Sequence, residues 1–380
     1  MNTSLNESIA FVWDNFGPMH VDRVDAVAAH FTNRRPVIGI EICGDSDVYD
    51  WVPEDGSKFR KIILFPHKKL AAIGTLERAR KIILACVQGR ASDIFLCHYD
   101  HPATFIAASC LRALGRRVYA MGCSKFDDYQ RNLWREVGKS LFYLPYCGGI
   151  SSGRRARDYM RFLGIPAGKI QTEYNTLSVD RIRKLAGVEP APGGVPFEQR
   201  HFTIVARLVP KKNIAMALDA YALYRTSSAL PHDLHLCGSG PLEKELRQQA
   251  ERLGIASYLT FHGFLQTEQV AKILGSTLAL LLPSAEEQFG NVVIEAQAMG
   301  VPVILSDNCG ARDVLVRSGV NGFVIEPDNP RGLAYFMEII GLDKRLFSRL
   351  AAESAAGDRA DAGQFAHGVA SLVSESTTSS

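Results

Sequence analysis

The sequence predicts an α/β protein of two domains, each built on a parallel sheet covered by helices. The chain has 380 residues, more than the ~250–300 residues that one hydrophobic core normally serves. Short apolar runs alternate with segments that carry apolar residues at helical spacing, which is the pattern of βαβ units. This alternation pauses at a Pro/Gly-rich stretch, residues 189–196, and then restarts. A composition of 47% hydrophobic and 22% charged residues excludes a disordered, collagen-like or coiled-coil chain.

In the first half, six apolar runs are predicted to be buried strands, with helices expected at residues 20–31 and 157–164. The strands are expected at residues 8–13, 36–43, 61–66, 92–99, 116–122 and 140–146.

After the stretch 189–196 the alternation is regular, and a helical tail follows it to about residue 373. Strands are expected at residues 201–208, 233–238, 258–263, 278–283, 302–307 and 322–327. Helices are expected at residues 213–225, 241–254, 267–276, 291–300, 311–319 and 330–341.

The formal net charge of +3 hides an asymmetry between the two halves. Residues 1–196 hold 27 Lys+Arg and 20 Asp+Glu, net +7, and the remainder holds 16 and 20, net −4. Residues 58–90 alone carry nine basic side chains and one acid, Glu77. This basic surface predicts either an anionic partner, with a membrane surface or lipid-linked acceptor preferred to nucleic acid, or simply solvated charge.

The eight cysteines contain no CxxC pair and mostly have apolar neighbours, so reduced thiols are expected in place of a zinc site or disulfides. No signal peptide and no apolar run of about 18 residues is present. We therefore expect a cytoplasmic protein that can also work at the inner face of the membrane.

The segment 283–310 contains the most informative pattern. Glu287 follows an apolar strand, Gly290 precedes the next helix, and Glu295 lies within that helix. Backbone N–H groups at Phe289, Gly290 and Asn291 suit a phosphate, because glycine allows close approach and a helix N-terminus favours an anion. Carboxylates beside a phosphate suit sugar and ribose hydroxyls, so the pattern predicts a nucleotide-sugar site.

Two other strand ends support this prediction. Arg207 ends one strand and Lys211 and Lys212 follow it, which suits a diphosphate. Gly238 and Gly240 separate another strand from its helix, but the third glycine of a dinucleotide fingerprint is absent.

These motifs resemble those of the family-4 retaining glycosyltransferases of GT-B fold, the glycosyl transferases group 1. The resemblance covers residues 200–335 and includes RLVPxK at Arg207, GxGP at Gly238, and the ExFG and EAxAxGxPV signature from Glu287 to Val303. It implies two Rossmann-like domains facing each other across a cleft, with a C-terminal helix that crosses back to the first domain. The expected boundaries are 1–190 for an acceptor-binding domain, 197–345 for a donor-binding domain, and 346–375 for the crossover tail.

The resemblance also implies roles for individual residues. Arg207 and Lys212 would neutralise the donor diphosphate, and Glu287 and Glu295 would bind sugar and ribose hydroxyls. The remaining residues expected at the donor are Gly17, Gly238, Gly240, Phe264, Leu265, Phe289, Gly290 and Asn291. Asn213 stands where a glycine is usual.

In the first half, His98, Asp100 and His101 follow one apolar strand, and the loop 14–23 follows another. The resemblance implies that a histidine contacts the donor sugar, with His101 expected, and that Gly17 lies near the leaving phosphate. Asn15, His20, His98 and Asp100 are weaker candidates for the acceptor.

The expected reaction is the transfer of a hexosyl group from a nucleotide sugar to a saccharide or lipid-linked saccharide hydroxyl. Configuration would be retained by front-face substitution, with neither cofactor nor obligatory metal, in polysaccharide or glycolipid synthesis. A donor-binding protein without catalysis is one alternative. Another is a serine hydrolase with Ser151 in GISSG as nucleophile and Asp313 and His367 as partners, and Asp45 and Asp47 offer a metal-binding DxD.

Overall fold

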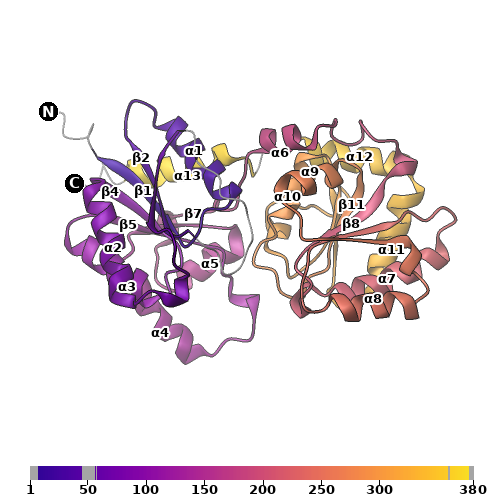
Figure 1. Ribbon diagram of the computed structural model, residues 1–380, viewed down its shortest axis with the longest axis horizontal. Coiled ribbons are helices and arrows are strands. Elements are labelled where there is room, and N and C mark those ends of the chain that lie inside the picture. Colours follow the sequence, from indigo (N-terminus) through magenta and orange to yellow (C-terminus); the bar gives the residue numbers. More distant parts are fainter. Residues whose placement is uncertain (1–6, 45–55, 57, 358–359, 376–380) are drawn as a thin grey trace. The chain divides into compact units, whose positions relative to one another are not determined.

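The computed structural model describes residues 7–44, 56, 58–357 and 360–375, and its ribbon is shown in Figure 1. The chain divides into two compact units, and each is described by itself. Unit 1 consists of Met1–Ser178 and Ala360–Ser380, and unit 2 consists of Val179–Arg359.

Unit 1 is built on a parallel sheet whose seven described strands follow the order β3-β2-β1-β4-β5-β6-β7. The strands are β1 (Ser8–Trp13), β2 (Val37–Cys43), β3 (Arg60–Phe65), β4 (Ala91–Leu96), β5 (Arg117–Gly122), β6 (Gly148–Ser151) and β7 (Ile170–Gln171). β1 pairs with β2 on one side and with β4 on the other, so the direction of winding reverses at β1. Ligands of open α/β sheets bind beyond the strand ends at such a reversal.

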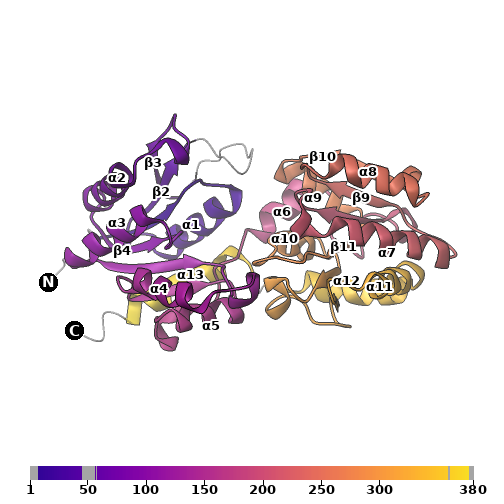
Figure 2. The same ribbon diagram turned by 90° about the horizontal axis from the view of Figure 1, so that it is seen from below.

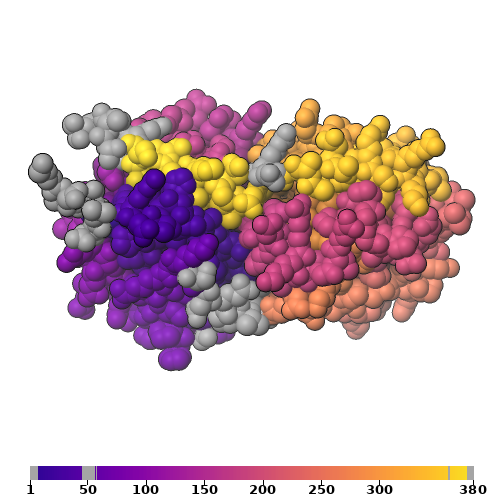
Figure 3. All heavy atoms as spheres, turned by 90° about the horizontal axis from the view of Figure 1, so that it is seen from above, coloured from indigo at the N-terminus to yellow at the C-terminus, as the bar shows by residue number. Residues whose placement is uncertain are grey.

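Helices cover both faces of this sheet (Figure 2). One apolar core joins β1 to α1 and α13, and the other joins the sheet to α2, α3, α5 and the end of α4. Figure 3 shows α13 beside α1 on one face of unit 1. The helices are α1 (Pro18–His30), α2 (Thr75–Gln88), α3 (Pro102–Ala113), α4 (Leu133–Tyr143), α5 (Arg154–Phe162) and α13 (Ala362–Glu375).

Unit 2 repeats the architecture with a parallel sheet of six described strands in the order β10-β9-β8-β11-β12-β13. The strands are β8 (His201–Val205), β9 (Leu234–Cys237), β10 (Leu259–Gly263), β11 (Thr277–Leu282), β12 (Val303–Ser306) and β13 (Gly322–Ile325). The helices are α6 (Val179–Ala186), α7 (Ile214–Ser227), α8 (Glu243–Arg252), α9 (Thr267–Gly275), α10 (Val292–Ala298), α11 (Pro330–Leu342) and α12 (Lys344–Ala355). Here the reversal lies at β8, between β9 and β11. Two Rossmann-like units were predicted, and this is confirmed.

The strand predicted at residues 140–146 is wrong, because this segment ends helix α4 and the strand is β6. Asn132 begins the helix by accepting hydrogen bonds from the backbone of Trp134 and Arg135, at 3.1 and 3.3 Å. One aromatic residue of this segment, Tyr143, packs against Tyr99 with ring centroids 4.4 Å apart. Likewise, the helix expected at 311–319 is a single 3₁₀ turn, Gly310–Asp313.

The division between the units also differs from the expected boundary near residue 190. Arg183 of α6 donates hydrogen bonds to the carbonyls of Ala298 and Ala355, at 2.9 and 3.2 Å. Ala191 is buried and its N–H donates to the Met299 carbonyl. Residues 179–196 therefore pack as part of unit 2, where a linker was expected.

The tail predicted at residues 346–375 also divides. Helix α12 packs on α10 and α11 in unit 2, and α13 alone returns to unit 1. There the ring of Phe365 packs at a tilt against Phe11, with 5.7 Å between ring centroids.

Candidate functional site

The loops that follow β8 and β11 in unit 2 are joined by an ion pair. The Lys212 Nζ donates to the Glu287 carboxylate, and the two side chains are 15% and 14% exposed. Both residues follow strands that neighbour each other at the reversal of the sheet. The structure thus brings together two of the predicted site residues from segments far apart in the chain.

Asn213 shapes the loop that carries Lys212. Its backbone is left-handed, with φ 56°, a conformation that asparagine tolerates better than most residues. Its side-chain amide donates to the carbonyls of Pro283 and Pro327, at 3.1 and 2.6 Å. The residue found in place of the usual glycine therefore keeps the turn and anchors it to two further loops.

Gly238 and Gly240 let the loop after β9 lie directly against the loop after β8. A Cβ on Gly238 would lie 1.9 Å from the Ala206 carbonyl oxygen, and one on Gly240 would lie 2.5 Å from that of Leu208. The Gly238 N–H donates to the Gly263 carbonyl at 2.7 Å, which fixes the turn that carries Phe264 and Leu265. Arg207, which lies between Ala206 and Leu208 in the loop after β8, is exposed.

The loop after β11 is tied to the loop after β12. The Gly310 N–H donates to the Glu287 carbonyl, and the Ala311 N–H donates to the Phe289 carbonyl at 2.9 Å. Phe289 is buried. Gly290 has φ 99°, and Glu295 lies half-buried on α10.

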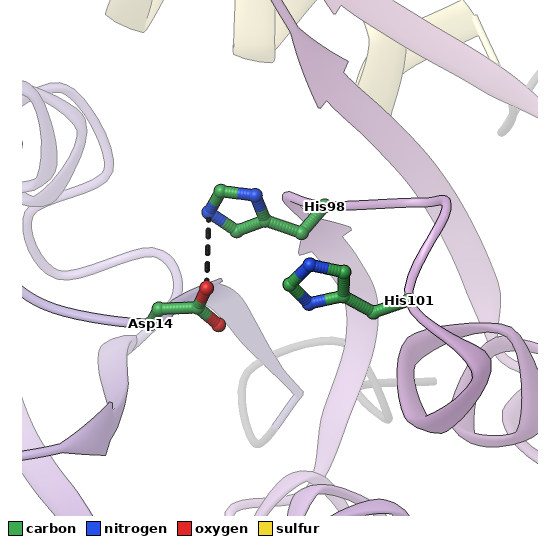
Figure 4. Close-up of side chains that lie close together, drawn as sticks. All are labelled: Asp14, His98 and His101. Atoms are coloured by element: carbon green, nitrogen blue, oxygen red, sulfur yellow. Dashed lines mark ion pairs between the residues drawn. The ribbon is translucent and has the colours of Figure 1, made fainter. Parts of the chain in front are cut away.

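In unit 1, three polar side chains gather beyond the ends of β1 and β4 (Figure 4). The His98 Nε2 lies 3.3 Å from the Asp14 Oδ2, and the rings of His98 and His101 stack with centroids 5.1 Å apart. His98 has a left-handed backbone, with φ 55°. The predicted His98 and His101 are thus adjacent, at the reversal of the sheet.

The two histidines have opposite electrostatic environments. The charge of Cys97, with those of Asp14 and Asp100, raises the pKa of His98 to about 10. Burial lowers the pKa of His101 below its ordinary value. Burial would raise the pKa of Cys97, but the charge of His98 and its hydrogen bond outweigh it and lower that pKa. The structure thus pairs a cationic His98 with a neutral His101 near neutral pH.

The other predicted residues of unit 1 have local structural roles. His20 Nδ1 accepts the Gly17 N–H at 3.0 Å at the start of α1, and the Asn15 amide donates to the Cys43 carbonyl at 2.7 Å. Gly17 has φ −89°, an ordinary value, so its place does not depend on glycine's freedom. Asp100 is exposed and lies outside the Asp14–His98–His101 group.

Asp14 and Cys97 were not predicted as site residues. Each comes directly after a buried strand beside the reversal of the sheet, Asp14 after β1 and Cys97 after β4. That position was the available signal, because strand ends at a reversal meet in space whatever their distance along the chain.

Zn²⁺ is commonly coordinated by side chains of the types found in this group, Asp14, His98 and His101. The two rings are inclined by 11°, and each nitrogen lone pair lies in its own ring plane, so one ion cannot face both without rotation of a ring. The geometry therefore supports an ion pair more directly than a metal centre. The absence of a required metal stays a prediction, and Asp45 and Asp47 lie outside the described residues.

The hydrolase alternative is wrong. Ser151 is fully buried at the end of β6 and its hydroxyl donates to the Gln171 carbonyl at 3.0 Å. A serine nucleophile must reach its substrate, and this hydroxyl is enclosed within the sheet edge.

The basic segment 58–90 forms β3 and α2 in its described part. Arg78 is buried there, and Lys61 pairs with Glu41 at 3.1 Å. Throughout the described residues, the helices are too short or too polar to cross a membrane.

Residues 189–353 match the model of the family described as glycosyl transferases group 1. Among curated relatives, the D-inositol 3-phosphate glycosyltransferase of Streptomyces avermitilis is 29% identical over 53% of this chain and 45% of its own length. A putative colanic acid biosynthesis glycosyltransferase, WcaL, of Salmonella typhimurium is 27% identical over 68% of this chain and 65% of its own length. The first three curated relatives are matched over less than half of their lengths, 45%, 30% and 48%.

Solved structures resemble the whole chain. Anabaena Alr3699/HepE, crystallised with UDP and glucose, has a TM-score of 0.72 at 18% identity and covers 97% of this chain and 100% of its own. Sucrose-phosphate synthase of Thermosynechococcus elongatus has a TM-score of 0.75 at 19% identity, covering 98% and 100%. At such low identity the likeness shows the fold, and the chain has the GT-B fold of two Rossmann-like domains.

Proposed function

From the match of residues 189–353 to the glycosyl transferases group 1 family, we propose that the protein transfers a hexosyl group from a nucleotide-diphosphate sugar to an acceptor hydroxyl. The observation that carries the proposal is the Lys212–Glu287 pair at the reversal of the unit 2 sheet. It puts a cation for phosphate and a carboxylate for sugar hydroxyls on adjoining loops.

The donor diphosphate is proposed to bind Arg207, Lys212 and the backbone N–H groups of residues 289–291. Lys212 is mostly buried, so its charge is screened less by water than that of an exposed lysine. Charge grows on the diphosphate as the glycosidic bond breaks, and fixed cations stabilise that charge. Glu295 is proposed to bind the ribose, and the 263–265 turn to contact the base.

Retention of configuration is proposed to proceed by front-face substitution. Glu287 is the carboxylate proposed to contact the donor sugar, and its ion pair with Lys212 weakens it as a nucleophile. A role in binding hydroxyl groups of the sugar suits such a neutralised carboxylate better. The departing phosphate would then accept the proton of the acceptor hydroxyl.

In unit 1, His101 is proposed to contact the donor sugar. Burial favours its neutral form, which can donate one hydrogen bond and accept another. The acceptor is proposed to be a saccharide or lipid-linked saccharide of polysaccharide or glycolipid synthesis, a choice that the name of the WcaL relative supports. The proposed place of action is the cytoplasm, at the inner face of the membrane.

A panel of nucleotide sugars tests the donor site. Saturation-transfer NMR should identify one nucleotide-sugar class that binds, and this donor should then be consumed with a saccharide acceptor and release nucleotide diphosphate. Activity should persist in EDTA, because protein cations hold the diphosphate.

Three outcomes would count against the proposal. Donor binding without transfer to any acceptor would favour a donor-binding protein. Loss of transfer in EDTA with recovery on adding a divalent cation would contradict the metal-free mechanism. If no nucleotide sugar in the panel binds, the proposal is wrong.

A further inference from the structure

Helix α4 (Leu133–Tyr143) turns a charged side toward the protein. Among its residues, all of which the structure describes, Glu136 and Tyr143 are the buried ones. The Glu136 carboxylate accepts hydrogen bonds from Lys139 at 2.8 Å, from Arg131 at 3.3 Å, and from the Tyr159 hydroxyl of α5. The Tyr159 hydrogen bond joins the helix to α5. Apolar contacts come from the C-terminal end of the helix, where Tyr143 packs against Tyr99 and Phe142 packs against Phe105.

Other large apolar side chains, on the helix and at Leu144 directly after it, face outward. Five large side chains, here named the α4 face, are each more than half exposed: Leu133 62%, Trp134 83%, Val137 52%, Leu141 58% and Leu144 76%. At ~100° per residue these five positions fall within a sector of about 100°, so they form one stripe. A monomeric protein rarely exposes a contiguous apolar surface without a use for it.

Further aromatic rings lie on the elements that flank the helix. Phe126 and Phe162 are 51% and 48% exposed, and their ring centroids are 5.6 Å apart. Phe126 precedes α4 in the chain and Phe162 ends α5. Figure 1 shows α4 at the periphery of unit 1, beyond the sheet-covering helices α3 and α5.

The surroundings of the α4 face are basic. Arg135 is exposed on α4, and α5 has the sequence RRARDYMRF, with four arginines and one acid. That acid, Asp158, lies 3.4 Å from Arg161, and Asp127 lies 2.6 Å from Arg155. Residues 125–161 carry eight Lys and Arg against four acids, so this part of the chain has a net charge of +4 and attracts anions.

We propose that the α4 face inserts into the surface of an anionic lipid bilayer. An amphipathic helix with tryptophan and leucine on one side and basic residues beside it lies in the headgroup region, and anionic lipids add about 1 kcal/mol per nearby Lys or Arg. This surface differs from the basic segment 58–90. The inference goes beyond the proposed transfer reaction, since vesicle binding requires neither donor nor acceptor.

Vesicle binding by the full-length protein tests the proposal. It should co-sediment with vesicles of phosphatidylcholine mixed with phosphatidylglycerol, bind more weakly to phosphatidylcholine alone, and dissociate as salt is added. Fluorescence should shift to the blue and be quenched by brominated lipid, and Trp134→Phe should remove both signals.

Leu144→Glu and Leu230→Glu form a matched pair, because both leucines are 76% exposed and Leu230 lies in unit 2. Leu144→Glu should lower vesicle partitioning at least about 10-fold, the effect of losing one inserted leucine, whereas Leu230→Glu should have no effect. Both should melt like the wild type. A second variant, Leu141→Glu, should repeat the loss.

Three results would overturn the proposal. The first is no binding to either vesicle, and the second is equal binding by Leu144→Glu and the wild type. The third is self-association in analytical ultracentrifugation that Leu144→Glu abolishes without lipid, which would assign the α4 face to a second copy of the chain. Transfer activity plays no part in these measurements, so the two proposals fail separately.

Discussion

Lys212 and Glu287 form an ion pair that connects the loops after β8 and β11, and each side chain is about 85% shielded from solvent, with 15% and 14% exposed. A buried pair of this kind orients both partners. It also leaves a buried charge without a counterion when one partner is removed.

Lys212→Ala should lower kcat/KM for glycosyl transfer at least about 100-fold, because a cation at the leaving diphosphate is lost. Lys211→Ala is the matched control, since this neighbouring exposed lysine should matter little. Glu287→Ala should also depress transfer strongly. In the double variant the losses should not add, because the two residues act as a unit. Wild-type rates in Lys212→Ala and Glu287→Ala would remove both residues from the site.

Gly238→Ala should destabilise unit 2 by about 3 kcal/mol or more, from backbone strain together with steric overlap. Gly238 has φ 143° and no room for a Cβ beside the Ala206 carbonyl. Gly254→Ala is the control, because Gly254 has φ 69° but open space around it, and it should cost only about 1 kcal/mol. Thermal melts of both variants give the comparison. Equal losses of stability in the two variants would show that backbone strain alone, and not the close contact between the loops, accounts for the need for glycine at position 238.

The sequence shows the turns of the unit 2 loops more directly than the side-chain contacts of unit 1, and the reason is physical. Backbone geometry determines the loops of unit 2, and glycine at positions such as 238 and 290 is visible in the sequence. In unit 1, the role of each side chain depends on which residues, distant in the sequence, it contacts in the folded protein. Whether the Asn15 amide meets a ligand or the Cys43 carbonyl depends on how the loop closes.

The wrong strand at 140–146 has a similar origin. A short apolar run fits a buried strand or a helix equally well, and here Asn132 and the Glu136 network decide for a helix. The same network turns Leu141 and Leu144 outward, against the usual rule that apolar residues face the core. The unit boundary was also missed, because a Pro/Gly-rich composition does not show that Ala191 is buried.

The pKa values of His98 and His101 should be shifted in opposite directions from the ordinary value of a histidine. The pKa of His98 is raised to about 10, so NMR should show it protonated at pH 8, whereas His101, whose pKa is lowered by burial, should already be neutral. Cys97→Ser should lower the pKa of His98 more than Asp14→Asn does, because the charge of Cys97 is the larger cause.

The linked effect on stability has a definite sign. A pKa raised on folding contributes stability that is fully present below the ordinary value near 6.5 and is lost as the pH rises through about 10. His98→Asn should therefore flatten the fall in stability on the alkaline side. An ordinary titration of His98 near 6.5 would contradict the ion pair.

Asp93 should be the carboxylate that contributes most to the stability of unit 1. Its side chain is fully buried and lies 2.6 Å from both Arg35 and Arg117. Burial alone would raise the pKa of Asp93, but hydrogen bonds from Arg117 and the charges of both arginines outweigh it and lower the pKa below 3.8. Asp93→Asn should destabilise unit 1 by about 3–5 kcal/mol, because two half-buried cations lose their fully buried counterion.

Melting curves over a range of pH check this. A pKa lowered on folding contributes stability that is present above the ordinary value near 3.8 and is lost as the pH falls through the lower value of the folded state. The wild type should therefore lose its unit 1 transition steeply in acid, and Asp93→Asn should lose it less steeply from a lower starting point. Asp158→Asn, at a side chain 55% exposed, should stay within about 0.5 kcal/mol of the wild type. A similarly small change in Asp93→Asn would mean that the Arg35–Asp93–Arg117 group adds little to the stability of the fold.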